Sequence, residues 1–208
     1  MSDVSVAQPY VIALGALGTV RLFPKNTVLV QEGDKSDQIY VVLTGRLKVF
    51  LADSDGKEII VDTLGPNQYF GEMALDGEPR SASVMTVEAS KLAVVQRADF
   101  KRFLAEHPDD SFQFILALIQ RARNLTRTVG NLALLDVYGR VARLLLDNAV
   151  EESSRLVVVE RMSQQEIAKR VGSSREMVSR ILGDLREGKY ISMENNRIVI
   201  QQQLPKHW

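Results

Sequence analysis

The 208-residue sequence contains no cysteine and only two histidines. The absence of cysteine excludes disulfides, cysteine-ligated iron–sulfur clusters, thiolate zinc sites and cysteine nucleophiles. His107 and His207 leave little for haem or metal ligation or for imidazole acid–base chemistry. No Walker, H-E-x-x-H, G-x-S-x-G or G-x-G-x-x-G sequence is present either. We therefore expect a protein that is not an enzyme and that holds no metal, haem or iron–sulfur cluster.

Long apolar runs and net charge are lacking as well. No run approaches the roughly 18 apolar residues of a membrane span, and the N-terminal sequence MSDVSVAQPY has no basic segment typical of a signal peptide. We expect a cytoplasmic protein without membrane contact. The 26 basic and 26 acidic residues cancel, which at first argues against a nucleic-acid partner. With 45% hydrophobic and 25% charged residues, the chain has an ordinary globular composition and the length of one or two domains.

Short β-prone runs separated by glycines fill the first hundred residues. They lie at residues 27–30, 39–43, 47–51, 59–61, 82–87 and 91–95. Residues 53–56, Asp-Ser-Asp-Gly, join two of these runs and predict a hairpin, because glycine tolerates a positive φ. The pattern predicts an antiparallel β-sandwich or barrel.

The pattern becomes helical near residue 98, and Pro108 ends a first short helix at residues 106–107. In the following helix, apolar residues recur in heptad steps of four and three. They are Leu118, Ala122, Leu125, Val129 and Leu132. This spacing predicts homodimerisation through the helix, although a helix packed on its own domain remains an alternative. The charged residues beside this seam are predicted to face solvent; they are Arg121, Arg123, Arg127 and Asp136.

A polar joint at residues 151–154 and a strand at residues 156–159 precede two short helices. Ser163 and Glu166 form a capping box at the start of the first helix, and Gly172 supplies the left-handed residue that ends it. Residues 173–176, Ser-Ser-Arg-Glu, form a second capping box that immediately restarts a helix. Two helices joined by so tight a turn predict a helix-turn-helix. Residues 190–193 and 197–200 predict a terminal hairpin, or wing, around Asn195 and Asn196.

The second of these helices leaves polar residues off its apolar face. They are Arg175, Glu176, Ser179 and Arg180. Arginine can bond guanine bidentately and glutamate can accept from cytosine, so these residues are candidates for reading bases in the major groove. The candidates for phosphate contacts are Gln165, Lys169, Ser173 and Ser174. Residues 137–208 hold 12 Lys and Arg against 9 Asp and Glu, whereas residues 1–136 hold 14 against 17. The neutral total therefore conceals a basic C-terminal part.

A glycine-rich element at residues 70–84 is the other candidate site. Gly71 permits a close backbone approach, and the amides after it could open a short helix that favours an anion. Arg80 and Ser81 could hold a phosphate, and the Glu72 carboxylate could accept from sugar hydroxyls. A β-turn with a surface Glu–Arg ion pair is the alternative interpretation.

The residue order of three segments resembles the bacterial CRP/FNR family of transcription regulators. Residues 70–82 resemble the phosphate-binding cassette of cyclic-nucleotide-binding domains, residues 172–182 the family's recognition helix, and residues 129–140 the end of its dimer helix and its hinge. The resemblance implies an α+β chain. Its parts would be an antiparallel β-roll or jelly-roll cyclic-nucleotide-binding domain (1–108), a dimerisation helix (109–136) and a winged helix-turn-helix (137–208).

The resemblance also implies roles for single residues. Glu72 would bond the ribose 2′-hydroxyl, while Arg80 and Ser81 would hold the cyclic phosphate with backbone help from Gly71 and Met73. The family's adenine contact is a Thr-Ser pair on the dimer helix, where this chain has Leu125 and Thr126. Thr126 could keep a purine contact, but Leu125 cannot hydrogen-bond.

The implied partners are double-stranded DNA with palindromic half-sites similar to TGTGA, a second copy of the chain, and RNA polymerase. The implied effector is cyclic AMP. The alternatives are a constitutive regulator, one that senses cyclic GMP, cyclic di-GMP or another small metabolite, and a cyclic-nucleotide-binding subunit whose C-terminal domain contacts protein.

Overall fold

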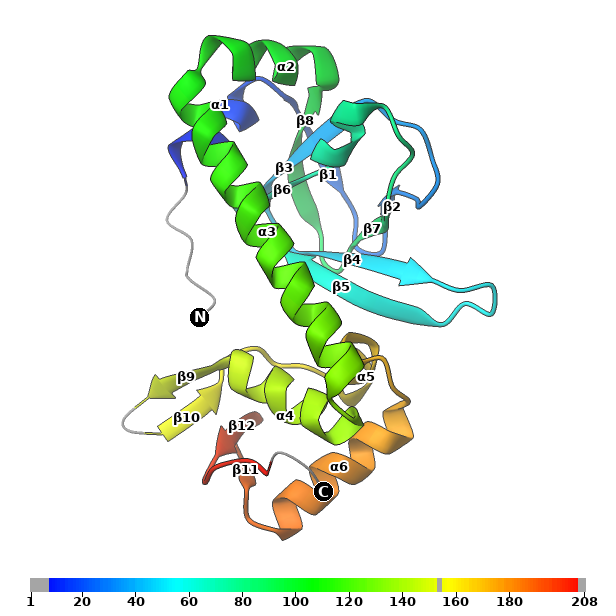
Figure 1. Cartoon of the computed structure of the whole chain (residues 1–208), viewed down its shortest axis with the longest axis vertical. Coiled ribbons are helices and arrows are strands. Elements are labelled where there is room, and N and C mark those ends of the chain that lie inside the picture. The colour runs from blue at the N-terminus through cyan, green and yellow to red at the C-terminus, as the bar shows by residue number, and fades with distance from the viewer. Residues whose placement is uncertain (1–7, 153–154, 206–208) are drawn as a thin grey trace. The chain divides into compact units, whose positions relative to one another are not determined.

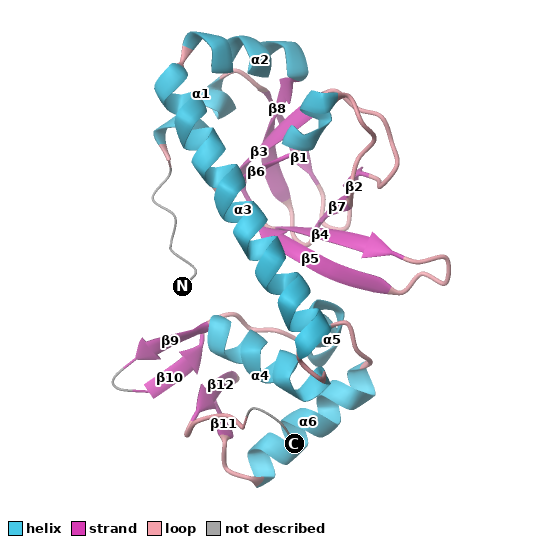
Figure 2. Ribbon diagram, in the orientation of Figure 1, coloured by secondary structure: helices cyan, strands magenta, loops and turns pink. Residues whose placement is uncertain are grey.

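The computed structural model describes residues 8–152 and 155–205 (Figures 1 and 2). The chain forms two compact units, whose boundary falls between Arg121 and Ala122 within the long helix α3 (Pro108–Leu134). The other elements of the first unit are α1 (Pro9–Ala16), β1 (Thr19–Phe23), β2 (Val28–Val30), β3 (Gln38–Thr44), β4 (Leu47–Ala52), β5 (Glu58–Leu64), β6 (Tyr69–Phe70), the 3₁₀ helix η1 (Glu72–Asp76), β7 (Ser83–Thr86), β8 (Ser90–Gln96) and α2 (Arg97–Glu106).

Two four-stranded antiparallel sheets form the first unit, with strand orders β1-β8-β3-β6 and β2-β7-β4-β5. The predicted antiparallel β-fold is confirmed. β4 and β5 are joined through the predicted Asp53–Gly56 turn, where Gly56 has a φ of 76°. The apolar core between the sheets is built by Val30, Tyr40, Val42, Leu47, Leu64, Phe70, Val84, Leu92 and Val94.

In the sheet β1-β8-β3-β6, the central strands β3 and β8 are buried on both faces, whereas β1 is exposed. Successive strand residues point to opposite sides, so Tyr40 and Val42 enter the core between the sheets while Ile39 and Val41 contact the helices. That second core also contains residues of α1, α2 and the first turns of α3: Tyr10, Val11, Leu14, Phe100, Phe103 and Phe114. Burial on both faces explains why residues 39–43 are a continuous apolar run rather than an alternating one.

The second unit contains the end of α3 and a helical bundle against a small sheet. Its elements are α4 (Val137–Asp147), β9 (Ala149–Glu152), β10 (Arg155–Val158), α5 (Gln164–Val171), α6 (Arg175–Glu187), β11 (Ile191–Glu194) and β12 (Arg197–Ile200). The sheet order is β11-β12-β10-β9. β11 and β12 form the predicted wing, and Asn195 and Asn196 take positive φ angles in its turn. A core shared by α4, α5 and α6 fixes these helices to one another.

The predicted polar joint at residues 151–154 is wrong for its first half. Glu151 and Glu152 belong to β9 and pair with β10, and residues 153–154 lie outside the described part of the chain. β9 is an edge strand, where outward-pointing charged side chains are tolerated. An ion pair between Arg197 Nη2 and Glu152 Oε1, 2.5 Å apart, further explains how Glu152 fits into the sheet.

Candidate ligand pocket and DNA-binding surface

The turn between β6 and η1 brings the glycine-rich element back against the sheet. Gly71 has a φ of 90°, which side-chain-bearing residues rarely adopt. A Cβ at this position would lie 2.7 Å from Arg80 Nη1 and 2.8 Å from the Gln38 carbonyl oxygen. Glycine is therefore required both by conformation and by space, and the short helix expected after it is present as η1.

Arg80 is almost fully buried, with 6% of its surface exposed. Its Nη1 donates to the Gly71 carbonyl (3.0 Å), and its Nη2 donates to Ser36 Oγ (2.9 Å) and to the Gln38 carbonyl (2.6 Å). Burial lowers the pKa of Arg80 from its ordinary value. The guanidinium is thus held in place by three neutral oxygens, none of which neutralises its charge.

Two buried polar atoms of this element have no hydrogen-bond partner among the described residues, Arg80 Nε and Glu72 Oε2. A buried donor or acceptor without a partner is costly unless something else satisfies it. One atom is a cationic donor and the other an anionic acceptor, so the pair suits a ligand that carries both a phosphate and a hydroxyl group. Ser81 lies beside them, and its Oγ donates to Met73 Sδ at 3.2 Å.

The structure corrects the expectation that Arg121 faces solvent. Its Nη1 donates to Glu72 Oε1 at 2.6 Å and its Nη2 to the Tyr69 carbonyl at 2.6 Å, and the guanidinium lies 4.4 Å from the centroid of the Tyr69 ring. Burial, the largest single influence, lowers the pKa of Arg121, but the charge and hydrogen bond of Glu72, together with Tyr69 and Asp62, raise it by more, so the pKa lies above its ordinary value. Sequence reasoning missed this residue because its partner lies 49 positions upstream. The spacing of residues along the helix shows only neighbours within about one turn, so it could not reveal the pairing of Arg121 with Glu72.

Leu125 and Thr126 lie in the second unit, and their position relative to the glycine-rich element stays a prediction. Thr126 Oγ1 donates to the Ala122 carbonyl of its own helix at 3.1 Å. Leu125 is 59% exposed in the single chain. The other large side chains of the predicted seam are exposed as well: Leu118, Val129 and Leu132. The apolar seam of α3 therefore has no cover within the described chain.

The helix-turn-helix is formed by α5 and α6. Ser163 accepts from the Glu166 amide and caps α5 as predicted, and Gly172 ends this helix with a φ of 63°. The second cap differs from the prediction: Ser174, not Ser173, is the N-cap and accepts from the Met177 amide. The tight turn at Gly172 leaves Ser173 outside the helix, which shifts the start of α6 by one residue.

The predicted base-reading residues share one exposed face of α6. Val178, Ile181, Leu182 and Leu185 are buried, whereas Arg175, Glu176, Ser179 and Arg180 are exposed. Hydrogen bonds from its own backbone amide and from Ser174 lower the pKa of Glu176, so this carboxylate stays ionised at neutral pH. Gln165 and Ser174 are exposed, and Lys169 and Ser173 are half-buried. All the predicted DNA contacts therefore come from α5, α6 and the turn that joins them.

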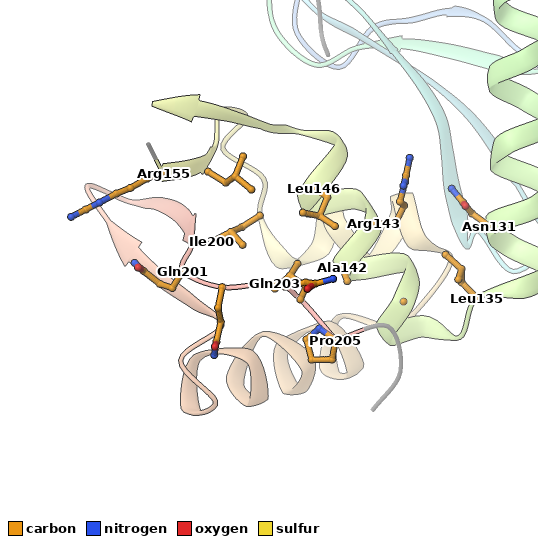
Figure 3. Close-up of a pocket in the computed structure, with 14 residues that line it drawn as sticks. Asn131, Leu135, Ala142, Arg143, Leu146, Arg155, Ile200, Gln201, Gln203 and Pro205 are labelled. Carbon is orange, nitrogen blue, oxygen red and sulfur yellow. The ribbon is translucent and has the colours of Figure 1, made fainter. Parts of the chain in front are cut away.

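A cavity of about 820 Å³ lies elsewhere in the second unit (Figure 3). Its lining is mixed: apolar residues such as Ala142, Leu146 and Pro205 stand beside polar ones that include Arg143 and the glutamines at 201–203. None of the predicted ligand-binding residues lines it. Within the described residues, no group of three metal-ligating side chains occurs, and no helix is long and apolar enough to cross a membrane.

Comparison with known proteins matches both units. Residues 20–107 match the cyclic nucleotide-binding domain family, and residues 139–203 match the Crp-like helix-turn-helix domain family. The chain is 31% identical to the CRP-like cAMP-activated global transcriptional regulator of Mycobacterium tuberculosis, over 86% of this chain and 82% of the relative. It is also 31% identical to the cAMP-activated global transcriptional regulator CRP of Escherichia coli, over 87% and 89%.

Among solved structures, the chain is similar to the c-di-GMP responsive global regulator CLP of Xanthomonas campestris. The TM-score is 0.76 at 24% identity, covering 93% of this chain and 98% of that one. At this identity the likeness shows the fold. The family is shown by the two domain matches and by the two curated relatives, which are transcriptional regulators rather than enzymes. The chain belongs to the CRP family of cyclic-nucleotide-binding, DNA-binding transcription regulators.

Proposed function

We propose that the protein is a cytoplasmic, homodimeric transcription regulator whose DNA binding is gated by cyclic AMP. In this proposal residues 1–108 bind the effector, residues 109–136 dimerise and residues 137–208 read DNA. The observation that carries it is the pair of buried atoms without a hydrogen-bond partner among the described residues, Arg80 Nε and Glu72 Oε2. A cyclic nucleotide offers a phosphate to the first and a ribose hydroxyl to the second.

The geometry of the glycine-rich element supports a set of proposed ligand contacts. Arg80 and Ser81 would hold the cyclic phosphate, with the backbone of Gly71 and Met73 beside them. Glu72 would accept from the 2′-hydroxyl through its free Oε2, because Arg121 already occupies Oε1. The names of the relatives from M. tuberculosis and E. coli support cyclic AMP as the effector.

The uncovered seam of α3 supports a two-fold dimer. Leu118, Leu125, Val129 and Leu132 are between 36% and 64% exposed, and large apolar side chains in heptad register pack against a second helix. A two-fold dimer would present its two recognition helices to half-sites about 34 Å apart, or one turn of DNA. We propose palindromic half-sites similar to TGTGA and RNA polymerase as a further partner.

Arg175, Glu176 and Arg180 would read base edges, with Ser179 beside them on the same exposed face. Gln165, Lys169, Ser173 and Ser174 would contact phosphates and set the position of the helix. Because residues 137–208 carry an excess of only three basic residues, specific affinity would depend on base contacts and two-fold symmetry more than on bulk charge.

Titration of the full chain with cyclic AMP, followed by DNA anisotropy with and without the nucleotide, tests the gating. A ligand shifts an equilibrium only if it binds the DNA-competent state more tightly, so DNA affinity must rise when cyclic AMP binds. Arg80→Lys and Ser81→Ala should both weaken nucleotide binding, whereas Arg102→Lys, on the exposed face of α2, should not. No heat of binding and no change in DNA affinity at millimolar cyclic AMP would refute the gating.

A second comparison separates DNA reading from ligand binding. Arg180→Ala should abolish preference for the palindrome over random DNA and leave nucleotide binding unchanged. Arg186→Ala, near the end of the same helix, is the matched control and should retain the preference. If Arg180→Ala keeps full sequence specificity, a cyclic-nucleotide-binding subunit that contacts protein is the better description.

Leu125 favours a second candidate, a regulator of the same family that answers to cyclic GMP, cyclic di-GMP or another metabolite, or to none. Leucine offers no hydrogen bond to a purine, and on the seam it strengthens association. Leu125→Thr decides: stronger dependence of DNA binding on cyclic AMP would show that Leu125 relaxes the gate.

A further inference from the structure

Arg140, in the first turn of α4, bonds two backbone segments that lie 36 residues apart. Its Nη1 donates to the Leu135 carbonyl at 2.8 Å, and its Nε donates to the Val171 carbonyl at 2.8 Å. Leu135 belongs to the two-residue linker between α3 and α4, and Val171 is the last residue of α5, directly before the helix-turn-helix turn. One planar guanidinium therefore joins the linker to that turn.

Within the described residues, no backbone amide outside the helices donates to either carbonyl. Val171 lies at the C-terminal end of α5, where the last four carbonyls have no intrahelical partner. The two amides that close the turn, those of Gly172 and Ser173, both donate to Ala168 instead. A cation at this end of a helix is also favoured by the helix dipole. Arg140 thus satisfies an acceptor that the turn itself leaves open.

The linker is closed onto α4 by two more contacts. Asp136 caps α4 by accepting from the Gly139 amide at 2.7 Å. A Cβ at Gly139 would lie 3.3 Å from both Asp136 Oδ1 and Leu135 Cβ, so the linker packs tightly against this turn. A change in the direction of α3 at the linker must therefore either break the bond from Arg140 to Leu135 or move Arg140 with it.

We propose that Arg140 is a positioning residue that transmits the setting of the α3–α4 linker to the recognition helix. The bond to Val171 would carry a movement of the linker into the turn, and α6 begins at Arg175, four residues later. This inference rests on the proposed gating, because it describes how a signal that reaches the end of α3 arrives at the DNA-reading face. Arg140 itself would contact neither nucleotide nor DNA.

The test compares Arg140→Lys and Arg140→Met with the unchanged full chain. Lysine keeps the charge, but its single nitrogen cannot reproduce two bonds from separate guanidinium nitrogens. Arg143→Met is the matched control, because Arg143 lies one turn further along α4 and pairs with the exposed Asp147 of the same helix. Two readouts are taken: the ratio of DNA affinities with and without cyclic AMP, and hydrogen exchange at residues 133–137 and 172–175.

We expect Arg140→Lys to reduce the affinity ratio about tenfold, which matches the loss of one or two hydrogen bonds from the coupling, with nucleotide affinity unchanged. Exchange should rise in both segments together. Arg143→Met should change neither readout. A merely structural role would lower DNA affinity equally with and without nucleotide, and this equal loss would overturn the inference.

Exchange that rises in only one segment, or in neither, would overturn it as well. If the unchanged protein shows no effect of cyclic AMP on DNA affinity, it is the proposed gating that fails. Hydrogen exchange then decides by itself whether Arg140 joins the linker to the turn.

Discussion

Replacing Arg121 with methionine removes the guanidinium that donates to Glu72 Oε1. The change leaves the Glu72 carboxylate, whose side chain is 10% exposed, and the Tyr69 carbonyl without these donors, and it removes the contact with the Tyr69 ring. Breaking a fully buried pair costs about 3–5 kcal/mol. Because the Arg121 side chain is 31% exposed, water partly replaces it, and we expect a loss of about 2 kcal/mol in the free energy of unfolding.

Urea unfolding followed by circular dichroism measures this loss, with a separate transition fitted for each unit because a chain of two units need not unfold in one step. Arg123→Met is the control, since Arg123 is exposed two positions further along the same helix; it should change stability by less than about 0.5 kcal/mol. The double variant Glu72→Gln/Arg121→Met should lose less than the sum of the two single variants. Equal stability of Arg121→Met and Arg123→Met would refute the reasoning.

Three further predictions concern single positions. Gly71→Ala should destabilise the first unit by about 1–3 kcal/mol and weaken nucleotide binding, because the new Cβ meets Arg80 Nη1 at a φ of 90°; an unchanged melting temperature and affinity would contradict it. Ser174→Ala should cost about 1 kcal/mol by removing the cap of α6, measured by urea unfolding against Ser173→Ala, which should cost less. Burial raises the pKa of Tyr138 to about 12. The buried, protonated phenol therefore contributes fully to the free energy of unfolding below pH 10, and this contribution is lost as the pH rises towards 12, by up to about 1.4 kcal/mol per pH unit. Tyr138→Phe should flatten this part of the stability curve, and an equally steep alkaline loss in the variant would argue against Tyr138 as its source.

Local patterns predicted most of the fold. The caps at Ser163 and Gly172 gave the helix-turn-helix, because capping chemistry depends on residues within one helical turn. The assignment of the second cap was wrong by one position, since Ser173 and Ser174 are equivalent in sequence and only the geometry of the Gly172 turn separates them. The glycines between apolar runs similarly predicted the antiparallel sheets.

Contacts between distant segments escaped prediction. Arg121 has the local surroundings of an exposed residue, and only the fold brings it to Glu72 and Tyr69. β9 was missed because Glu151 and Glu152 have low strand propensity, and tertiary pairing with β10 outweighs that preference. The role of Arg80 in bonding the Gly71 and Gln38 carbonyls likewise depends on the closed turn and not on neighbouring residues.

The end of the glycine-rich element is tied to the loop between β2 and β3 and back to its own start, which constrains how such a chain could diversify. The Arg80 amide donates to the Asp34 carbonyl and the Gly33 amide donates to the Arg80 carbonyl, both at 2.9 Å, while the Arg80 side chain returns to Gly71. An insertion or deletion between residues 71 and 80 would break this closure. Descendants of such a chain would therefore acquire new effectors by exchanging side chains within a segment of fixed length, while its backbone path stays the same.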